Sequence, residues 1–243
     1  MDFEQSLAAV ENTSQRLVAA VRAESLDLVV PSCPEWTLAK LVAHTGKVQQ
    51  WATAIVERRS LEPVSPRELD RPPEGEAVVD WFALGAQRFE AVFREVGPKA
   101  AVWTWGAGAT SAWWARRVMH ETAVHLWDAQ HATAHEEPID AVIARDGIDE
   151  FFLNLSAHPG LSQTVSGNGQ TIHLHCTDTA GEWLIVLTPT GVVVTAEHAK
   201  GDVAVRGPVS DVLLYVIGRL SPERLDVYGD AALALHWQAI AKF

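Results

Sequence analysis

Residues 120–128 carry the side chains whose types and spacing are best suited to chemistry. Glu121 and His125 are four positions apart, so in a helix they project from one face, with Asp128 close to both in angle. A carboxylate, an imidazole and a second carboxylate on one stripe are typical of two metal ligands and a supporting partner. His120 is five positions from His125, so the zinc-protease signature of two histidines four apart is absent. We therefore do not expect His120 to be a ligand.

His44 is the natural third ligand. It lies on the apolar stripe of a helix predicted over residues 37–58, so we expect it to face the same interior as Glu121 and His125. Two histidines and a glutamate form a catalytic zinc set that leaves a position open for water or substrate. The alternative is a core histidine hydrogen-bonded to Glu121 without a metal. Burying two carboxylates and two imidazoles without a cation is costly, but the pattern alone leaves both interpretations open.

The first part of the chain has the apolar periodicity of helices. The spacing predicts four amphipathic helices, over about residues 3–21, 37–58, 76–96 and 112–134, which together make a four-helix bundle. The proline-rich stretch over residues 60–75 is predicted to be a connection. A fifth helix, over about residues 140–157, completes a first domain that we assign to residues 1–158.

From Gly167 onward the apolar period changes to two, which is typical of half-buried strands. Strands are predicted over residues 171–177, 183–187, 192–195, 202–206 and 225–228. A helix over residues 209–220 and a closing helix accompany them. The sequence thus predicts an α+β fold in which a bundle precedes a smaller α/β domain, residues 159–243, with a mainly antiparallel sheet.

The composition excludes several classes of function. The formal net charge of −12 disfavours a nucleic-acid partner. Two cysteines cannot form a disulfide framework, which favours a reducing cytoplasm. The N-terminal residues do not resemble a signal peptide, and no apolar run is long enough to span a membrane. We therefore expect a cytoplasmic protein without a membrane partner, and the oligomeric state stays open.

Other side chains suggest chemistry less strongly. His173 and His175 share one strand face, a spacing that suits either a metal ion or an exposed sheet surface. Cys33 could be a nucleophile, although packing explains it as well. Arg117 lies one turn before Glu121, where it could form a salt bridge or bind an anion. Four tryptophans near the candidate site suggest an apolar pocket wall: Trp103, Trp105, Trp113 and Trp114.

Three segments of the bundle together resemble the mycothiol-dependent maleylpyruvate isomerase family. They are CPEWT at residues 33–37, LVAH at residues 41–44 and RVMHETAVHLWD at residues 117–128. The N-terminal domain of that family is a DinB-like four-helix bundle. The resemblance continues at residues 201–203 and 215–219, which are similar to the family's C-terminal α/β domain, itself similar to sterol-carrier folds. It therefore extends over nearly the whole chain.

The resemblance implies a set of roles. The family's zinc ligands fall on His44, Glu121 and His125, and a basic residue placed over the metal cleft falls on Arg219. Asp128 would orient a metal-bound histidine or shuttle a proton, and Arg219 would hold a substrate carboxylate. The implied cofactors are a divalent metal, zinc, and mycothiol, whose thiolate adds to the cis double bond of maleylpyruvate and leaves again to give fumarylpyruvate.

The motifs are shared by a broad set of relatives, which leaves the electrophile open. A mycothiol S-transferase acting on another small electrophile is an alternative enzyme. A non-catalytic protein that binds an apolar ligand in its sterol-carrier-like domain is a further alternative. For either enzyme, the expected partners are a small-molecule substrate and a low-molecular-weight thiol.

Overall fold

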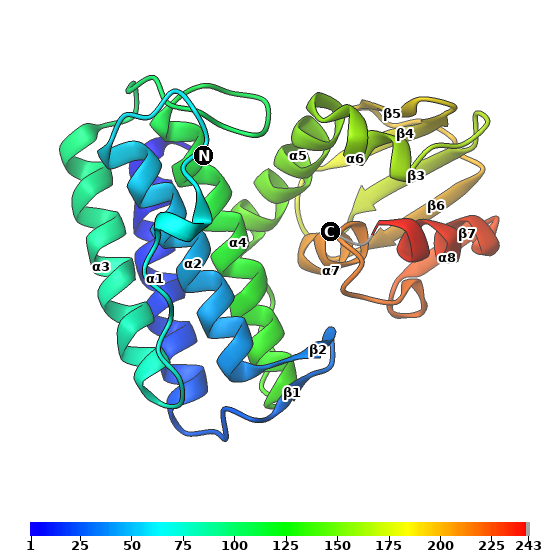
Figure 1. Ribbon diagram of the computed structural model, residues 1–243. Coiled ribbons are helices and arrows are strands. Elements are labelled where there is room, and N and C mark those ends of the chain that lie inside the picture. Colours follow the sequence, from blue (N-terminus) through cyan, green and yellow to red (C-terminus); the bar gives the residue numbers. More distant parts are fainter. Residues whose placement is uncertain (242–243) are drawn as a thin grey trace. The chain divides into compact units, whose positions relative to one another are not determined.

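The chain forms two compact units, Met1–Glu137 and Pro138–Phe243, in the computed structural model (Figure 1). The structure describes residues 1–241, apart from the side chain of Pro159, so the last two residues of the predicted second domain lie outside the described part. We expected the boundary at residue 158. It falls earlier because α5 (Ala141–Ala157) packs against the other elements of the second unit, chiefly α7, α6 and β5.

The first unit is the predicted four-helix bundle (Figure 1). Its helices are α1 (Phe3–Arg22), α2 (Leu38–Glu57), α3 (Ala77–Val96) and α4 (Ser111–Ala132). Both α1 and α2 contact α3 and α4, so a single apolar core lies between them. The helix bounds agree with those predicted to within two residues, because each helix carries a long and regular apolar stripe.

Polar side chains set where two of these helices begin. The Asp2 carboxylate accepts from the backbone N–H of Gln5, and the Gln5 side chain accepts from the backbone N–H of Asp2, which is a capping box. Thr37 caps α2, where its hydroxyl accepts from the backbone N–H of Lys40 at 3.4 Å. The cap on α2 fixes the start of the helix that carries His44.

A short hairpin before α2 was not predicted from the sequence. Strand β1 (Val29–Val30) pairs antiparallel with β2 (Cys33–Thr37), with Val29 opposite Thr37 and Val30 opposite Cys33. Strands this short leave no period to detect, and Pro34 argues against a strand. The connection over residues 60–75 is confirmed as irregular apart from a 3₁₀ turn, η1 (Pro66–Glu68).

The second unit is built on a five-stranded sheet in the order β5-β4-β3-β6-β7. The strands are β3 (Thr171–Cys176), β4 (Glu182–Thr188), β5 (Gly191–Thr195), β6 (Val203–Gly207) and β7 (Asp226–Gly229). Neighbouring strands are antiparallel except β3 and β6, which are parallel. The prediction of a mainly antiparallel sheet is thus confirmed.

The remaining elements of the second unit are short helices. They are α6 (Pro159–Thr164), α7 (Val209–Val216), η2 (Pro222–Arg224) and α8 (Ala231–Ile240). We predicted that α7 would extend to residue 220. It ends earlier because Gly218 adopts a left-handed φ of 74°, which reverses the chain. No helix among the described residues has the length and apolar character needed to cross a membrane.

The two faces of the sheet differ in what covers them. Ile172, Leu174 and Ile185 are fully buried on the face towards the helices. On that face the Trp183 indole N–H donates to Asp149 of α5 at 2.8 Å. The alternate residues of β3 and β4, among them His173, point to the opposite face.

Gly46 allows α2 and α3 to approach closely. A Cβ atom at this position would lie 2.3 Å from ring carbon Cζ3 of Trp81 on α3. Gly85 on α3 is a contrasting case, because nothing lies within 4 Å of the Cβ position there. The two glycines are both helical but differ in the space beside them.

We predict opposite effects of alanine at these two glycines. Gly46→Ala should lower the free energy of unfolding by about 1–3 kcal/mol, because the rigid Trp81 ring must move. Gly85→Ala should raise it by up to about 1 kcal/mol, because alanine has the higher helix propensity. Urea denaturation followed by circular dichroism measures both changes. A stabilising Gly46→Ala would contradict the close helix contact.

Candidate metal centre

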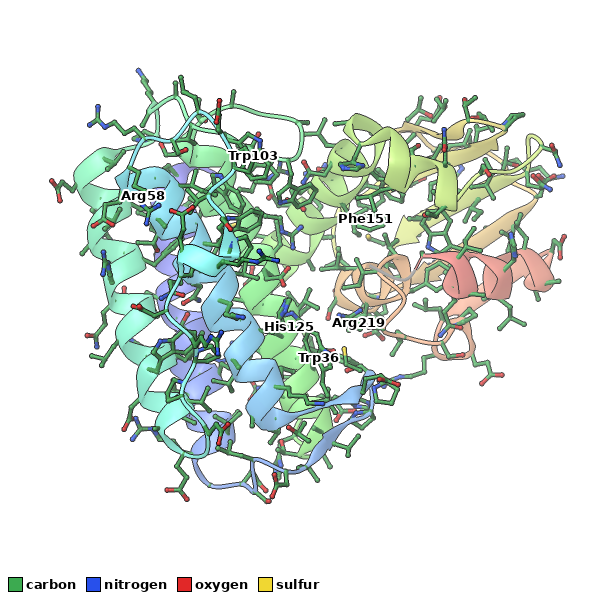
Figure 2. All side chains as sticks on the ribbon, viewed as in Figure 1. Trp36, Arg58, Trp103, His125, Phe151 and Arg219 are labelled. Carbon is green, nitrogen blue, oxygen red and sulfur yellow. The ribbon has the colours of Figure 1, made fainter. Side chains whose placement is uncertain are left out.

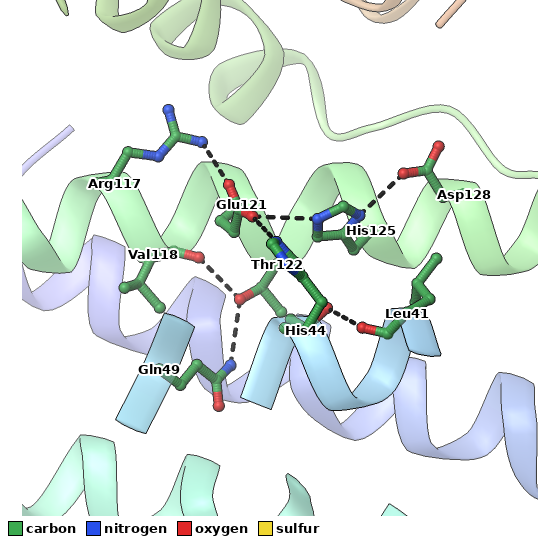
Figure 3. A network of polar contacts seen from close by, with 10 residues as sticks. Leu41, His44, Gln49, Arg117, Val118, Glu121, Thr122, His125 and Asp128 are labelled. Carbon is green, nitrogen blue, oxygen red and sulfur yellow. Dashed lines mark hydrogen bonds and ion pairs between the residues drawn. The ribbon is translucent and has the colours of Figure 1, made fainter. Parts of the chain in front are cut away.

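Helices α2 and α4 bring His44, Glu121 and His125 together (Figure 3). The Nε2 atom of His44 lies 2.9 Å from Oε1 of Glu121, and Nε2 of His125 lies 3.1 Å from the same oxygen. One possible ligand atom from each residue lies within 4.8 Å of the others. The convergence that the helical spacing suggested is therefore present.

Asp128 lies behind His125 and holds its other ring nitrogen. Oδ2 of Asp128 is 2.9 Å from Nδ1 of His125, and Oδ1 accepts a hydrogen bond of 2.5 Å from the Ser32 hydroxyl. The Asp128 side chain is fully buried. A carboxylate only accepts hydrogen bonds, so Asp128 keeps a proton on Nδ1, and Nε2 is the atom that loses its proton when the ring becomes neutral. This tautomer is the one that a metal on Nε2 requires.

Trp36 of the β1–β2 hairpin packs against both imidazoles, and Figure 2 labels it beside His125. Its ring centroid lies 4.6 Å from that of His44 and 5.7 Å from that of His125, and the two histidine rings are 5.1 Å apart. An indole in this position shields one side of the site from water and limits rotation of both rings. No pattern in the sequence placed Trp36 or Ser32 at the site, because the hairpin that carries them was not predicted.

Arg117 forms the predicted salt bridge with Glu121, from Nη2 to Oε2 at 3.2 Å. The two oxygens of Glu121 thus have different partners, since Oε2 accepts from the guanidinium while Oε1 faces the two imidazoles (Figure 3). Because Arg117 fixes one oxygen, the other has a defined direction.

The electrostatics of the site favour positive charge. Although burial opposes ionisation, contacts with His125, His44 and Arg117 hold the pKa of Glu121 well below its usual range. Burial also opposes a charge on His125, but its contacts with Asp128 and Glu121 raise its pKa to about 9. Positive groups around Glu121 and two carboxylates around His125 cause these shifts, and a bound cation would likewise balance the two carboxylates.

Exposure of the side chains increases from His125 to His44. The His125 side chain is 5% exposed, Glu121 is 22% exposed and His44 is 39% exposed. We expected His44 on the inward stripe of α2, but it lies at the margin of the bundle, because α2 turns Leu41 and Thr45 into the core instead. The open side of the site is therefore the His44 side.

The donor set fits a divalent transition metal. Two imidazole nitrogens and one carboxylate oxygen are ligands that zinc accepts, whereas magnesium and calcium prefer oxygen ligands alone. Three protein ligands leave at least one coordination position open. His120 is buried and is not part of the cluster, as expected.

Arg219 belongs to the second unit, and Cys33 to the hairpin of the first. Arg219 is half-buried in the second unit, in the turn after α7, where its backbone N–H donates to the Leu214 carbonyl at 2.7 Å. Cys33 packs against the core of the bundle, which favours the packing interpretation. Burial raises the pKa of the Cys176 thiol to about 12, so this thiol is poorly suited to nucleophilic chemistry at neutral pH.

The four tryptophans that we expected at a pocket wall pack on one another and on Trp51. Trp103 lies 5.5 Å from Trp51 of α2 and 6.2 Å from Trp114 of α4, measured between ring centroids. The Trp114 indole donates to the Trp103 carbonyl at 2.7 Å. Trp105 and Trp113 form a further edge-to-face pair with centroids 5.0 Å apart. These rings anchor the loop before α4 to α2 and α4.

Two protein-family models match the chain in sequence. One is described as the mycothiol maleylpyruvate isomerase N-terminal domain and matches residues 7–130, and the corresponding C-terminal domain matches residues 143–236. These matches fall on either side of the boundary between the two compact units. No protein of curated function matches the sequence.

Two similar solved structures are those of the mycothiol-dependent maleylpyruvate isomerase and of a histidine-to-alanine variant of it. The variant has a TM-score of 0.60 at 13% identity over 93% of each chain, and the other structure has 0.54 at 16% identity over 90% of each chain. These likenesses confirm the α+β fold. A UbiJ-SCP2 ubiquinone synthesis protein has a TM-score of only 0.32, at 18% identity over 43% of this chain and 96% of that one, so the likeness to sterol-carrier folds stays a prediction.

We predict that Asp128→Asn weakens zinc binding in the bundle by about 10- to 100-fold, because the charge that holds the His125 tautomer is lost. Ser32→Ala removes one hydrogen bond to Asp128 but keeps the carboxylate, so its effect should be smaller. Zinc titration against a competing chelator measures the affinity of both variants. The binding event that belongs to the bundle is the one that is absent in His125→Ala. Unchanged affinity in Asp128→Asn would contradict the role given to this carboxylate.

Proposed function

Because the chain belongs to the mycothiol maleylpyruvate isomerase family, we propose that it is a metal-dependent enzyme with mycothiol as its thiol cosubstrate. His44, Glu121 and His125 are its metal ligands, zinc is its metal, and its reaction is the cis–trans isomerisation of an unsaturated keto acid such as maleylpyruvate. The likeness to solved isomerases over nearly the whole chain supports this proposal.

The observation that carries the proposal is the meeting of two imidazole nitrogens at one carboxylate oxygen. Both Nε2 atoms lie within 3.1 Å of Oε1 of Glu121, and the open side of the site is next to His44. Three ligands on two helices that are packed into a bundle are held with little freedom. The arrangement suits a catalytic metal more than a structural one, because a coordination position is left for a substrate.

The side chains around the ligands have separate roles in the proposal. When bound, a zinc ion lowers the pKa of a thiol that it coordinates, so that thiolate is available at neutral pH. Asp128 keeps the proton of His125 on Nδ1 and so orients Nε2. Arg117 neutralises part of the charge on Glu121 and fixes its rotamer. Trp36 excludes water from one side of the imidazoles.

The reaction places further demands on the protein. Isomerisation requires a thiolate that adds to the cis double bond, permits rotation about the resulting single bond and then leaves. We propose that Arg219 binds a substrate carboxylate and stabilises the enolate charge that forms on addition. The alternative role proposed for Asp128 is to shuttle a proton itself, because a ring bound to the metal through Nε2 cannot relay one.

Loss of a ligand tests the metal site directly. His44→Ala and His125→Ala should each lose one zinc ion per chain relative to the wild type, measured by elemental analysis of protein purified without chelator. Activity with mycothiol and maleylpyruvate should fall with the lost ion, by about 10³-fold or more. His135→Ala is the matched control, because this histidine is exposed and lies outside the cluster. An unchanged ion count in both ligand variants would refute the site.

The products distinguish an isomerase from a transferase. An isomerase returns free mycothiol after each turnover, so a small amount of thiol converts an excess of maleylpyruvate. An S-transferase consumes one thiol per electrophile and leaves a conjugate that mass spectrometry detects. Substoichiometric thiol with full conversion supports the isomerase, whereas conversion that stops when the thiol is exhausted shows a transferase.

A further inference from the structure

A second cluster of possible ligands lies on the face of the sheet opposite the helices. His173 and His175 are two positions apart on β3, so their side chains share that face. Glu182 of β4 is directly opposite His175 in the antiparallel register. Two imidazoles and a carboxylate therefore stand on neighbouring strands as a consequence of the sheet itself.

The connection between β5 and β6 adds a third imidazole. These strands are separated in the sheet by β4 and β3, so residues 196–202 must cross both to reach β6. The register places Thr195 and Ala204, at the two ends of the crossing, in one row with His173. The crossing covers about 14 Å, three strand spacings, well within the reach of the segment. His198 lies near the middle of this segment, and its ring centroid is 5.3 Å from that of His173.

The contacts within the cluster converge on Glu182. Its Oε2 lies 3.1 Å from Nε2 of His173 and 2.5 Å from Nδ1 of His198, and its Oε1 lies 3.1 Å from Nδ1 of His175. One possible ligand atom from each of the four residues lies within 4.8 Å of the others. Ligands of a tetrahedral zinc ion lie roughly 3.4 Å apart, so small side-chain rotations close the set around an ion.

Ion pairing alone does not account for this cluster. One carboxylate balances one imidazolium, yet three imidazoles surround Glu182. Arg206 of β6 is next to His175 in the register and lies opposite Asp226 of β7, so this row adds no net negative charge to pair with further imidazolium ions. Three nitrogen donors and one oxygen donor make instead a complete ligand set for a divalent transition metal.

We propose that the second unit binds a zinc ion of its own, separate from the ion in the bundle. The four ligands are one oxygen donor and three nitrogen donors: Glu182, His173, His175 and His198. Four protein ligands leave no open position, so this is a structural site. It joins the sheet to residues 196–202, because His198 is the one ligand that the segment supplies.

The burial of the ligands supports this division. The His173 side chain is 8% exposed, and those of Glu182 and His175 are 27% and 31% exposed, whereas that of His198 is 79% exposed. Three ligands are thus held by paired strands, and the fourth lies in the part of the segment before Gly201 and Asp202, which hold its end to β3. Zinc binding would chiefly order that segment rather than the sheet.

The ion count tests the proposal independently of the bundle site. In the His44→Ala variant we expect zinc titration to show one bound ion per chain, and none after His175→Ala is added. His236→Ala is the matched control, because it removes an exposed histidine of the same unit and should keep the ion. Absence of zinc binding in His44→Ala would overturn the proposal, as would binding that His175→Ala leaves unchanged.

Limited proteolysis gives a second measurement. It needs no activity assay, and it compares the wild-type chain with and without zinc, so a ligand variant that folds poorly does not affect it. Lys200 is exposed within residues 196–202 and is a trypsin site. Zinc should slow cleavage after Lys200 of the wild-type chain by at least about tenfold, because cleavage needs the segment to leave the sheet. In His198→Ala, zinc should not slow it. Cleavage of the wild type at the same rate with zinc and with chelator would contradict the proposed role.

Discussion

Negative charge buried beside imidazoles on α4 is the constraint on which the first unit depends. Asp128 is fully buried and Glu121 largely so, and buried carboxylates are tolerated only when they are hydrogen-bonded and balanced by positive charge. The bundle meets this demand from three directions, with Arg117 on the same helix, His44 on α2 and Ser32 in the hairpin. The contacts from His44 and Ser32 also fix neighbours of α4. The contacts that stabilise the buried carboxylates therefore also hold the neighbouring elements against α4.

Helical periodicity was enough to predict which side chains of the bundle come together as candidate metal ligands. Glu121 and His125 were placed on one face by their spacing alone, and His44 by its position on the stripe of α2. Periodicity could not show that His44 lies at the margin, because that depends on which side of α2 packs against its neighbours. Ser32 and Trp36 were out of reach for another reason, since β1 is too short to have a period and Pro34 interrupts β2.

In the second unit, local pattern predicted the strands but not what lies across them. The alternating pattern placed His173 and His175 on one face but did not distinguish a metal site from an exposed sheet surface. Their neighbours Glu182 and His198 come together through strand register and through the crossing of residues 196–202, and neither is visible from spacing along the chain. Helix α5 was predicted correctly but assigned to the wrong side of the boundary, because an amphipathic stripe does not say which partner it will cover.

The parallel pairing of β3 with β6 has a consequence for how the second unit folds. Strands β3, β4 and β5 follow one another as antiparallel neighbours, so their pairing closes only short loops. Strand β6 pairs with β3 only after the intervening chain has passed over two strands, and contacts distant in sequence form more slowly. We expect the three-stranded meander to form first, with one edge of β3 exposed until β6 docks. That transient edge is the place where partly folded chains would associate.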